Sequence, residues 1–421
     1  MALKITWTDN NASEQGHRIY ISDQPMDPDN LPTPHGEAGP DITEYLALDI
    51  DDEAEWHIIV SAFRGASEVL SDPLHYDPTD PGPGPGPTGE IIGVVLIQTD
   101  VAGGVMAHID EAGNTIASPD TAWFDARAPW AGMVDEVIDG QHMVKIPKFY
   151  YRRGPITAGE HAGRDAWWIS PSPAPGFKVH PAFEFGGNEV DQFWYGKYQG
   201  YVEGGKLCSI PGVTPTRSRS ITQFLADGFA RNVGGVNGFR MHHVNMVSAI
   251  QWLALIEAAS FDSKQVYGAG RPSSASPAPV DAADTAEASY RGIIGAWGNI
   301  WQWCDGLRMT SGGYLERRGY ESGVLTFGWT GLFNRVSSSA HSPISFRSDA
   351  AVDDLFITAT AGPLLGSVTL PEYVGYTGGG TVYLYVGGGN TAGYQGLWSV
   401  SVYDSATLTY TVIGSRLARV L

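Results

Sequence analysis

The stretch Asp80-Pro-Gly-Pro-Gly-Pro-Gly-Pro87 divides the sequence into two parts with different patterns. Alternating proline and glycine build neither a helix nor a sheet, because proline lacks the backbone N–H and glycine loses the most conformational entropy on ordering. We therefore predict a linker over residues 80–89, between a first domain of residues 1–79 and a second domain of residues 90–421. The alternative is a loop inside one domain, which the different patterns on its two sides disfavour.

Composition narrows the class of both domains. The chain has 53 glycines and 27 prolines among 421 residues, 11% aromatic residues and 43% hydrophobic residues, which argues against disorder and favours a soluble, β-rich protein. Acidic residues exceed basic ones by 46 to 26, and the net charge of −20 argues against binding to nucleic acid or to an anionic membrane surface. The sequence shows neither a membrane-spanning apolar run nor a secretory signal pattern, and its two cysteines cannot form a disulfide scaffold.

The first domain has the pattern of a small β-sandwich. Short alternating strands are separated by clusters of Asn, Asp and Pro; they are Leu3–Thr8, His17–Ser22 and Trp56–Phe63. This segment resembles a fibronectin type III domain, with residues 5–7, 18–21 and 56–62 similar to its strands B, C and F. Ile50 precedes Trp56 by the family's spacing, although Trp56 replaces the usual Tyr and nothing upstream of Leu3 supplies strand A. The domain is therefore expected to be incomplete or to borrow an edge strand from a partner.

The second domain mixes strands with two helices. Strands are expected at residues 91–97, 142–151 and 381–386, and a hairpin is expected from residues 397–403 and 407–413 around the turn at 404–406. Helical spacing predicts helices over residues 218–232 and 244–261, the first capped by Ser220 or Thr222 and the second by Asn245. The expected fold class is α+β and β-rich: a β-sandwich, then two helices packed on antiparallel sheets.

Several stretches of the second domain together resemble phage tail-fibre and tropism-determinant proteins. They are Met143–Tyr151, Pro175–Phe183, Tyr195–Tyr198, Ala249–Glu257 and Tyr290–Trp303. The resemblance implies the C-type-lectin fold, which the formylglycine-generating, sulfatase-modifying proteins share. Their Gly-Asn-Val-Trp-Glu-Trp motif is similar to Gly298-Asn-Ile-Trp-Gln-Trp303, and their closing Gly-Phe-Arg-x-Ala-Arg is similar to Gly414-Ser-Arg-Leu-Ala-Arg419. We expect the tryptophans to be core residues and the Gly-Asn pair to form a positive-φ turn.

Residues with catalytic or metal-binding potential have simpler explanations. Cys208 and Cys304 match no reactive pair, and Cys304 is expected to be a small buried side chain. Adjacent His242 and His243 point to opposite faces of an extended chain, so one is expected to be exposed and the other packed. The acidic runs at 49–53 and 353–354 are expected to be solvated turns rather than calcium sites. We therefore predict no enzyme activity, no metal and no cofactor.

Aromatic residues among glycines near the C-terminus suggest a binding surface, because rigid tyrosine and tryptophan anchors on pliable loops are typical of such surfaces. In residues 381–386 the aliphatic side chains should face the core, and Tyr383 and Tyr385 should be either displayed or buried against a neighbouring subunit. Residues 326–347 and 373–398 correspond to the receptor-facing stretches of the resembling proteins. The candidate receptor-binding residues are Trp329, Phe333, Asn334, Arg335, Tyr373, Tyr376, Tyr383, Tyr385, Tyr394 and Trp398.

The resemblance implies a virion tail protein that attaches the phage to the host bacterium. Its partners would be a glycan or protein receptor on the host surface and other tail or baseplate proteins, without nucleic acid or membrane insertion. A homo-oligomer, with a trimer favoured, would multiply weak contacts. The two unpaired cysteines fit synthesis in the bacterial host cytoplasm. A structural baseplate or tail-tip component is the alternative, and a sulfatase-modifying or glycan-degrading enzyme is disfavoured.

Overall fold

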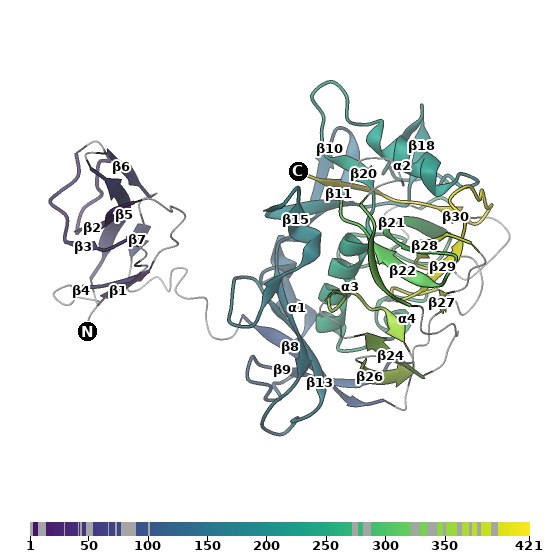
Figure 1. The fold of residues 1–421 in the computed structure, drawn as a ribbon, viewed down its shortest axis with the longest axis horizontal. Helices are drawn as coiled ribbons and strands as arrows, with labels where there is room; N and C mark the ends of the chain where they lie inside the picture. The colour runs from purple at the N-terminus through teal and green to yellow at the C-terminus, as the bar shows by residue number, and fades with distance from the viewer. Residues whose placement is uncertain are drawn as a thin grey trace. The chain divides into compact units, whose positions relative to one another are not determined.

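The computed structural model describes residues 3–6, 14–28, 30–40, 42, 44–47, 54–65, 67–71, 74–76, 90–99, 102–271, 277–280, 288–320, 328–334, 343–347, 351–359, 364–369, 373–376, 380–388 and 395–421. The chain forms two compact units, Met1–Pro87 and Thr88–Leu421 (Figure 1). The proline–glycine stretch and the acidic run at 49–53 lie outside the described residues. The fold is β-rich with few helices and belongs to the α+β class.

The described part of the first unit consists of two antiparallel sheets. One sheet has the order β3-β2-β5-β6 with β7 also on β5; its strands are β2 Gly16–Ser22, β3 Gly36–Ala38, β5 Trp56–Arg64, β6 Ser67–Leu70 and β7 Leu74–Tyr76. The other pairs β1 Leu3–Thr6 with β4 Glu44–Ala47. Ile5 and Ala47 from the small sheet pack with Ile19 and Ile58 from the large one, so alternate residues of both sheets form a shared core.

Three larger sheets organise the second unit. The first has the order β14-β12-β13-β8-β9, with β8 Ile92–Gln98, β9 Val105–Ile109, β12 Tyr150–Pro155, β13 Asp165–Ser170 and β14 Lys178–Val179. The second has the order β10-β11-β17-β31-β20, with β10 Asp135–Ile138, β11 Gln141–Pro147, β17 Gln192–Gly196, β20 Phe239–Met241 and β31 Leu417–Val420. The third has the order β23-β22-β21-β28-β29-β27 with β30 on β21; its strands are β21 Trp301–Met309, β22 Tyr314–Arg317, β23 Thr330–Asn334, β27 Val374–Tyr376, β28 Val382–Val386, β29 Val400–Asp404 and β30 Ile413–Gly414.

Smaller elements connect these sheets. They are the hairpins β15 Glu184–Phe185 with β16 Asn188–Glu189 and β18 Tyr201–Glu203 with β19 Lys206–Cys208, a sheet of β24 Pro343–Arg347, β25 Thr358–Ala359 and β26 Leu364–Thr369, and the short helices α1 Thr121–Asp125 and α4 Ser263–Tyr267. Within the described residues, no helix combines the length and the apolar character that a bilayer-spanning segment requires.

Helix α3, Val244–Ala258, lies at the centre of the second unit. It packs against β8 and β13 on one side and against β21 on another, as Figure 1 shows. Its side chains are buried from Val244 to Ile256, since a helix between two sheets has almost no solvent face. The prediction of this helix is confirmed, but its cap is His243, whose side chain accepts from the Asn245 N–H, and not Asn245.

Helix α2, Ile221–Phe229, begins with a complete capping box. The Ser220 side chain accepts from the Gln223 N–H, and the Gln223 side chain accepts from the Ser220 N–H. Ile221, Phe224 and Leu225 are buried, and the helix packs on β19, β20 and β21. The structure confirms this predicted helix and selects Ser220 over Thr222 as its cap.

Replacing the capping serine tests this local interaction. Ser220→Ala should lower the free energy of unfolding by about 0.5–2 kcal/mol, because the Gln223 N–H loses its acceptor. Urea unfolding followed by tryptophan fluorescence measures the change. The matched control is Thr222→Ala, at an exposed position in the first turn, for which we expect a change of less than about 0.5 kcal/mol. Equal losses in the two variants would contradict the assignment of the cap.

The C-terminal sheet differs from the sequence prediction in two respects. The predicted hairpin of residues 397–403 and 407–413 is wrong, because β29 is flanked by β28 and β27 and has no free edge for a second strand. The chain instead returns to β21 through β30. The pairs β27–β29 and β21–β30 are parallel, so this sheet is mixed rather than antiparallel throughout.

Candidate functional site

The two faces of the C-terminal sheet pack in different surroundings. Alternation along β28 sends Val382, Leu384 and Val386 into the main core, as predicted, and sends Tyr383 and Tyr385 to the opposite face. On the next strand, β29, Val402 packs in the main core. Ser401 and Tyr403 therefore lie on the same face as the two tyrosines of β28.

An aromatic pocket of about 300 Å³ opens on this second face; its lining residues are Trp301, Tyr373, Tyr385, Ser401, Tyr403, Asp404, Tyr410, Val412 and Ile413. We call it the aromatic pocket. Its residues come from β21, β28, β29, β30 and the segments beside them, which Figure 1 shows close together in the second unit. Five of the nine side chains are aromatic and one is a carboxylate.

Edge-to-face contacts hold the inner wall of the aromatic pocket. The Trp301 ring lies 5.0 Å from the Tyr385 ring at an angle of 83° and 5.9 Å from the Tyr373 ring at 78°. Trp303, two residues along β21, also contacts the Tyr385 ring, at 5.3 Å and an angle of 85°. Such T-shaped pairs fix ring orientation, so the wall is rigid before any ligand arrives.

The polar end of the aromatic pocket is formed by neighbouring strands. The Tyr385 hydroxyl hydrogen-bonds with Ser401 and Asp404, and burial raises the pKa of this tyrosine. Burial also raises the pKa of Asp404, against the opposing effect of the hydrogen bond from Tyr385. The carboxylate therefore lies in a partly desolvated position, where its charge acts more strongly than in water.

Two tyrosines form the accessible rim. Tyr403 and Tyr410 are each 52% exposed, whereas Trp301 and Tyr385 are 8% and 7% exposed. Large aromatic side chains held at a surface are the usual anchors of a binding interface. The aromatic pocket thus combines a buried, rigid wall with an open aromatic rim.

The structure brings together only part of the predicted receptor-binding set. Tyr373 and Tyr385 line the aromatic pocket. Tyr383 lies beside it against Trp329, whose ring is 6.0 Å away and covers the Arg308 guanidinium at 4.2 Å. Arg335 and Tyr394 lie outside the described residues, as do the side chains of Phe333 and Asn334 on β23.

Two predicted receptor-binding residues belong to the core instead. Tyr376 and Trp398 are each 2% exposed, and the Trp398 ring contacts Phe261 at 5.3 Å. Neither can contact a receptor, because the sheet and the segment after α3 cover them. Their glycine-rich surroundings suggested display, but burial depends on which face of the sheet each side chain takes.

Seven of the nine residues that line the aromatic pocket are absent from the predicted receptor-binding set; they are Trp301, Ser401, Tyr403, Asp404, Tyr410, Val412 and Ile413. Trp301 is a core residue at 8% exposure, as predicted, and it also lines the aromatic pocket. The sequence predicts Asp404 in a hairpin turn and Tyr403 and Tyr410 in hairpin strands. A usable signal was the alternation of Ser401 and Tyr403 with Val402, which predicts a polar and aromatic outer face. No signal in the sequence indicated that Trp301, about 100 residues upstream, joins the same face.

The predicted arrangement of the histidine pair is wrong, because both side chains are buried. His242 is 0% and His243 1% exposed. His242 lies 2.6 Å from the Tyr195 hydroxyl and 2.7 Å from the Trp303 carbonyl, and burial lowers its pKa to about 3. Cys304 is buried, as predicted. The described residues contain no cluster of His, Cys, Asp or Glu that could hold a metal ion.

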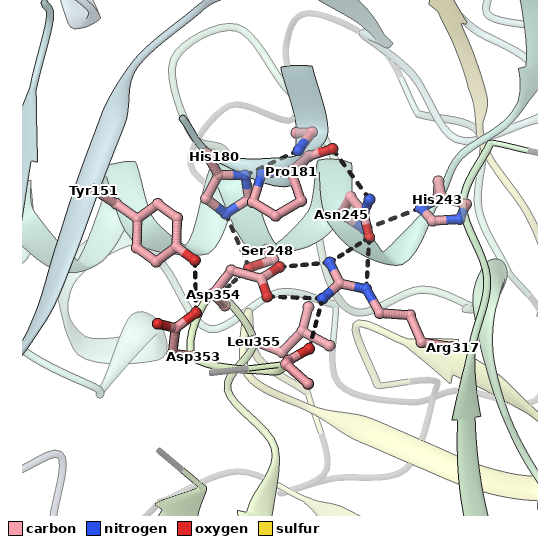
Figure 2. A network of polar contacts seen from close by, with 12 residues as sticks. Tyr151, His180, Pro181, His243, Asn245, Ser248, Arg317, Asp353, Asp354 and Leu355 are labelled. Carbon is pink, nitrogen blue, oxygen red and sulfur yellow. Dashed lines mark hydrogen bonds and ion pairs between the residues drawn. The ribbon is translucent and has the colours of Figure 1, made fainter. Parts of the chain in front are cut away.

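The predicted solvated turn at Asp353 and Asp354 is also wrong. Figure 2 shows that both carboxylates belong to a polar network beside α3. Asp354 is 2% exposed and forms a double ion pair with Arg317 at 2.6 and 2.8 Å, and Asn245 accepts from the same guanidinium at 2.8 Å. Asp353 accepts from the Tyr151 hydroxyl at 2.6 Å. Burial alone would lower the pKa of Arg317, but the ion pair with Asp354 outweighs it and raises the pKa.

A serine–histidine contact in this network does not form a nucleophile–base pair. His180 Nδ1 accepts from the Ala182 N–H, which places the ring proton on Nε2, 3.3 Å from Ser248 Oγ. The Ser248 hydroxyl in turn donates to the Asp354 carbonyl. Since the histidine nitrogen facing the serine carries a proton, it cannot accept one from it. Both residues therefore tie α3 to neighbouring segments.

Comparison with known proteins found no protein-family model that matches the sequence and no curated protein with significant similarity to it.

Proposed function

We propose that this chain is a receptor-binding protein of a phage tail, with the aromatic pocket as its contact site for the host surface. The observation that carries the proposal is the position of Tyr403 and Tyr410, half exposed over a rigid aromatic wall. Large aromatic side chains are enriched among the residues that contribute most to binding interfaces. Tyr403 and Tyr410 are therefore available for contact with a partner.

The resemblance of each unit, taken by itself, supports the same proposal. The second unit is proposed to have the C-type-lectin fold, with Trp301 and Trp303 of the Gly-Asn-Ile-Trp-Gln-Trp motif on β21 beneath the aromatic pocket. Gly298 and Asn299 adopt φ of 73° and 64° in the turn before this strand, as expected for the motif. The first unit is proposed to be a fibronectin type III-like module that attaches the protein to the tail. Host attachment would then take place in a homo-oligomer on the virion.

Removing the exposed rim tests the location of the site. The double variant Tyr403→Ser/Tyr410→Ser should bind host cells about tenfold more weakly or worse, because each substitution removes an aromatic anchor. Binding of the labelled protein to host cells and its ability to block phage adsorption are measured. The matched control is Tyr314→Ser, since Tyr314 is 37% exposed on β22 and does not line the aromatic pocket.

The outcomes separate the receptor function from a structural one. If the correctly assembled oligomer neither binds the host nor blocks adsorption, the receptor proposal fails, and a structural baseplate or tail-tip role is favoured. If the protein binds but the double variant binds equally well, receptor binding stands and the aromatic pocket is the wrong place.

A further inference from the structure

The charges of the aromatic pocket are one-sided. Asp404 lines it together with aromatic, aliphatic and hydroxyl side chains, and the described lining contains no Lys, Arg or His. The Tyr385 hydroxyl hydrogen-bonds with Asp404 but carries no positive charge. An anionic ligand would therefore meet a partly desolvated carboxylate without any compensating cation.

Three other partly or fully buried carboxylates of the second unit each have a guanidinium partner. Asp305 pairs with Arg318 at 2.6 Å, Glu257 with Arg291 at 2.7 Å, and Asp227 with Arg219 at 2.7 Å. Within the described residues, Asp404 has no such ion pair. A desolvated charge is stabilised by an opposite charge. Among these four carboxylates Asp404 alone lacks a cation, so a positively charged ligand would supply the missing opposite charge.

The aromatic rings of the pocket also favour a positively charged ligand. The face of a tyrosine or tryptophan ring is electronegative and attracts a cation that lies within about 6 Å of its centre, and this attraction strengthens when the cation is desolvated. The rings of Tyr373 and Tyr385 stand at 78° and 83° to the Trp301 ring, and all three residues line the aromatic pocket. Several rings around a cavity with one carboxylate form the arrangement that binds organic ammonium ions.

We propose that the aromatic pocket binds an organic ammonium group, with Asp404 as its counter-ion and Trp301, Tyr385 and Tyr403 as contacting rings. This inference rests on the site of the proposed function and identifies the chemistry of the part of the receptor that enters it. A quaternary ammonium, a primary alkylammonium and an amino sugar share this chemistry. A ligand that carries only carboxylate or phosphate groups does not.

Choline and its uncharged isostere 3,3-dimethylbutan-1-ol provide the direct test, because they have the same shape and differ in charge. Binding to the full chain is measured by titration calorimetry and by quenching of tryptophan fluorescence. Choline should bind about tenfold more tightly than the isostere. Equal affinity for the two compounds, or no binding of choline, would overturn the proposal without any need for a variant.

Asp404→Asn tests the counter-ion. Asparagine keeps an acceptor for the Tyr385 hydroxyl and removes the charge, so circular dichroism should be unchanged. The affinity for choline should fall several-fold but stay above that for the isostere, because the aromatic rings still attract the cation, while the affinity for the isostere should stay the same. The matched control is Asp191→Asn, at a side chain that is 88% exposed and outside the aromatic pocket, which should leave both affinities unchanged. A loss of affinity for choline in this control, or none in Asp404→Asn, would contradict the role of Asp404.

Further ligands identify the source of the ammonium group. Tetramethylammonium, methylammonium and glucosamine represent the quaternary, alkyl and amino-sugar forms, and N-acetylglucosamine is the uncharged counterpart of glucosamine. The ligand that binds most tightly should also compete best with host cells. If the protein blocks adsorption but no ammonium compound competes, the receptor proposal stands and this inference fails. If choline binds but no host cell does, the ammonium site stands and the receptor proposal fails.

Discussion

Arg416→Met is expected to lower the free energy of unfolding of the second unit by about 3–5 kcal/mol. Arg416 is 0% exposed, and no carboxylate is among its hydrogen-bond partners. It donates at 2.8 Å to Gln302 Oε1 and to the Gly196 carbonyl, and it also donates to the carbonyls of Lys197, Ile294 and Gly295. One guanidinium thus joins the strand β17, the strand β21 and the loop before β21.

The expected loss of stability comes from the buried oxygen acceptors that Arg416 leaves without a donor. Methionine fills part of the volume but donates no hydrogen bond, and each buried acceptor left without a donor costs about 1–3 kcal/mol. Burial lowers the pKa of Arg416 to about 10, which is still well above neutral pH, so the side chain stays charged and the carbonyls compensate its charge.

Urea unfolding, followed by tryptophan fluorescence, measures this effect against a control on the adjoining strand. Arg419, on β31, stacks on Trp194 at 5.0 Å and donates to the Asn237 carbonyl in a partly exposed position. Arg419→Met should cost less than about 1.5 kcal/mol, because water can replace the lost donor. A loss below about 1 kcal/mol in Arg416→Met would show that the carbonyls find other partners.

Asp354→Ala is expected to have the second large effect, a loss of about 3–5 kcal/mol. The substitution removes the carboxylate from Arg317, whose side chain is only 14% exposed, and leaves a buried positive charge beside α3. The Asn245 oxygen remains as an acceptor but carries no charge. Replacing both partners, in Arg317→Met/Asp354→Leu, should cost less than Asp354→Ala alone, because no unpaired charge is then left behind.

A double-mutant cycle in thermal or urea unfolding measures the coupling of this pair. The surface pair of Lys148 and Asp191 provides the control, since its carboxylate is 88% exposed. Asp191→Ala should change the stability by less than about 1 kcal/mol. A double variant that is as unstable as Asp354→Ala would show that the pair contributes by its shape and hydrogen bonds rather than by charge.

Features that depend on neighbouring residues could be predicted from the sequence. Helix α2 follows from apolar spacing over one helical face, and the hydroxyl residues at its start limit the cap to Ser220 or Thr222, of which the structure selects Ser220. The two faces of β28 follow from alternation, and the turn at Gly298 and Asn299 follows from the few residues that tolerate positive φ. In each case the interaction that decides the structure lies within about one turn or strand of the residue itself.

Features that depend on distant segments could not be predicted from the sequence. Asp353 and Asp354 resemble any exposed acidic pair until Arg317 and Tyr151 are placed beside them. The sequence predicts one exposed and one packed histidine, but His242 contacts Tyr195 and the Trp303 carbonyl and His243 packs on Tyr320, so both are buried. The hairpin after residue 397 was plausible locally and failed because β27 and β28 already occupy both edges of β29.

The aromatic pocket also combines features that the local sequence predicts with features that depend on distant segments. A β-rich chain with aromatic binding candidates in its C-terminal region follows from the sequence alone, since composition and alternation are local properties. The tertiary structure buries Tyr376 and Trp398 in the core. It also brings together the residues that line one pocket with Asp404, which are Trp301, Tyr373, Tyr385, Tyr403 and Tyr410. The physical reason is that strand order in a mixed sheet is set by packing between segments far apart in the chain, and this order decides which side chains share a pocket.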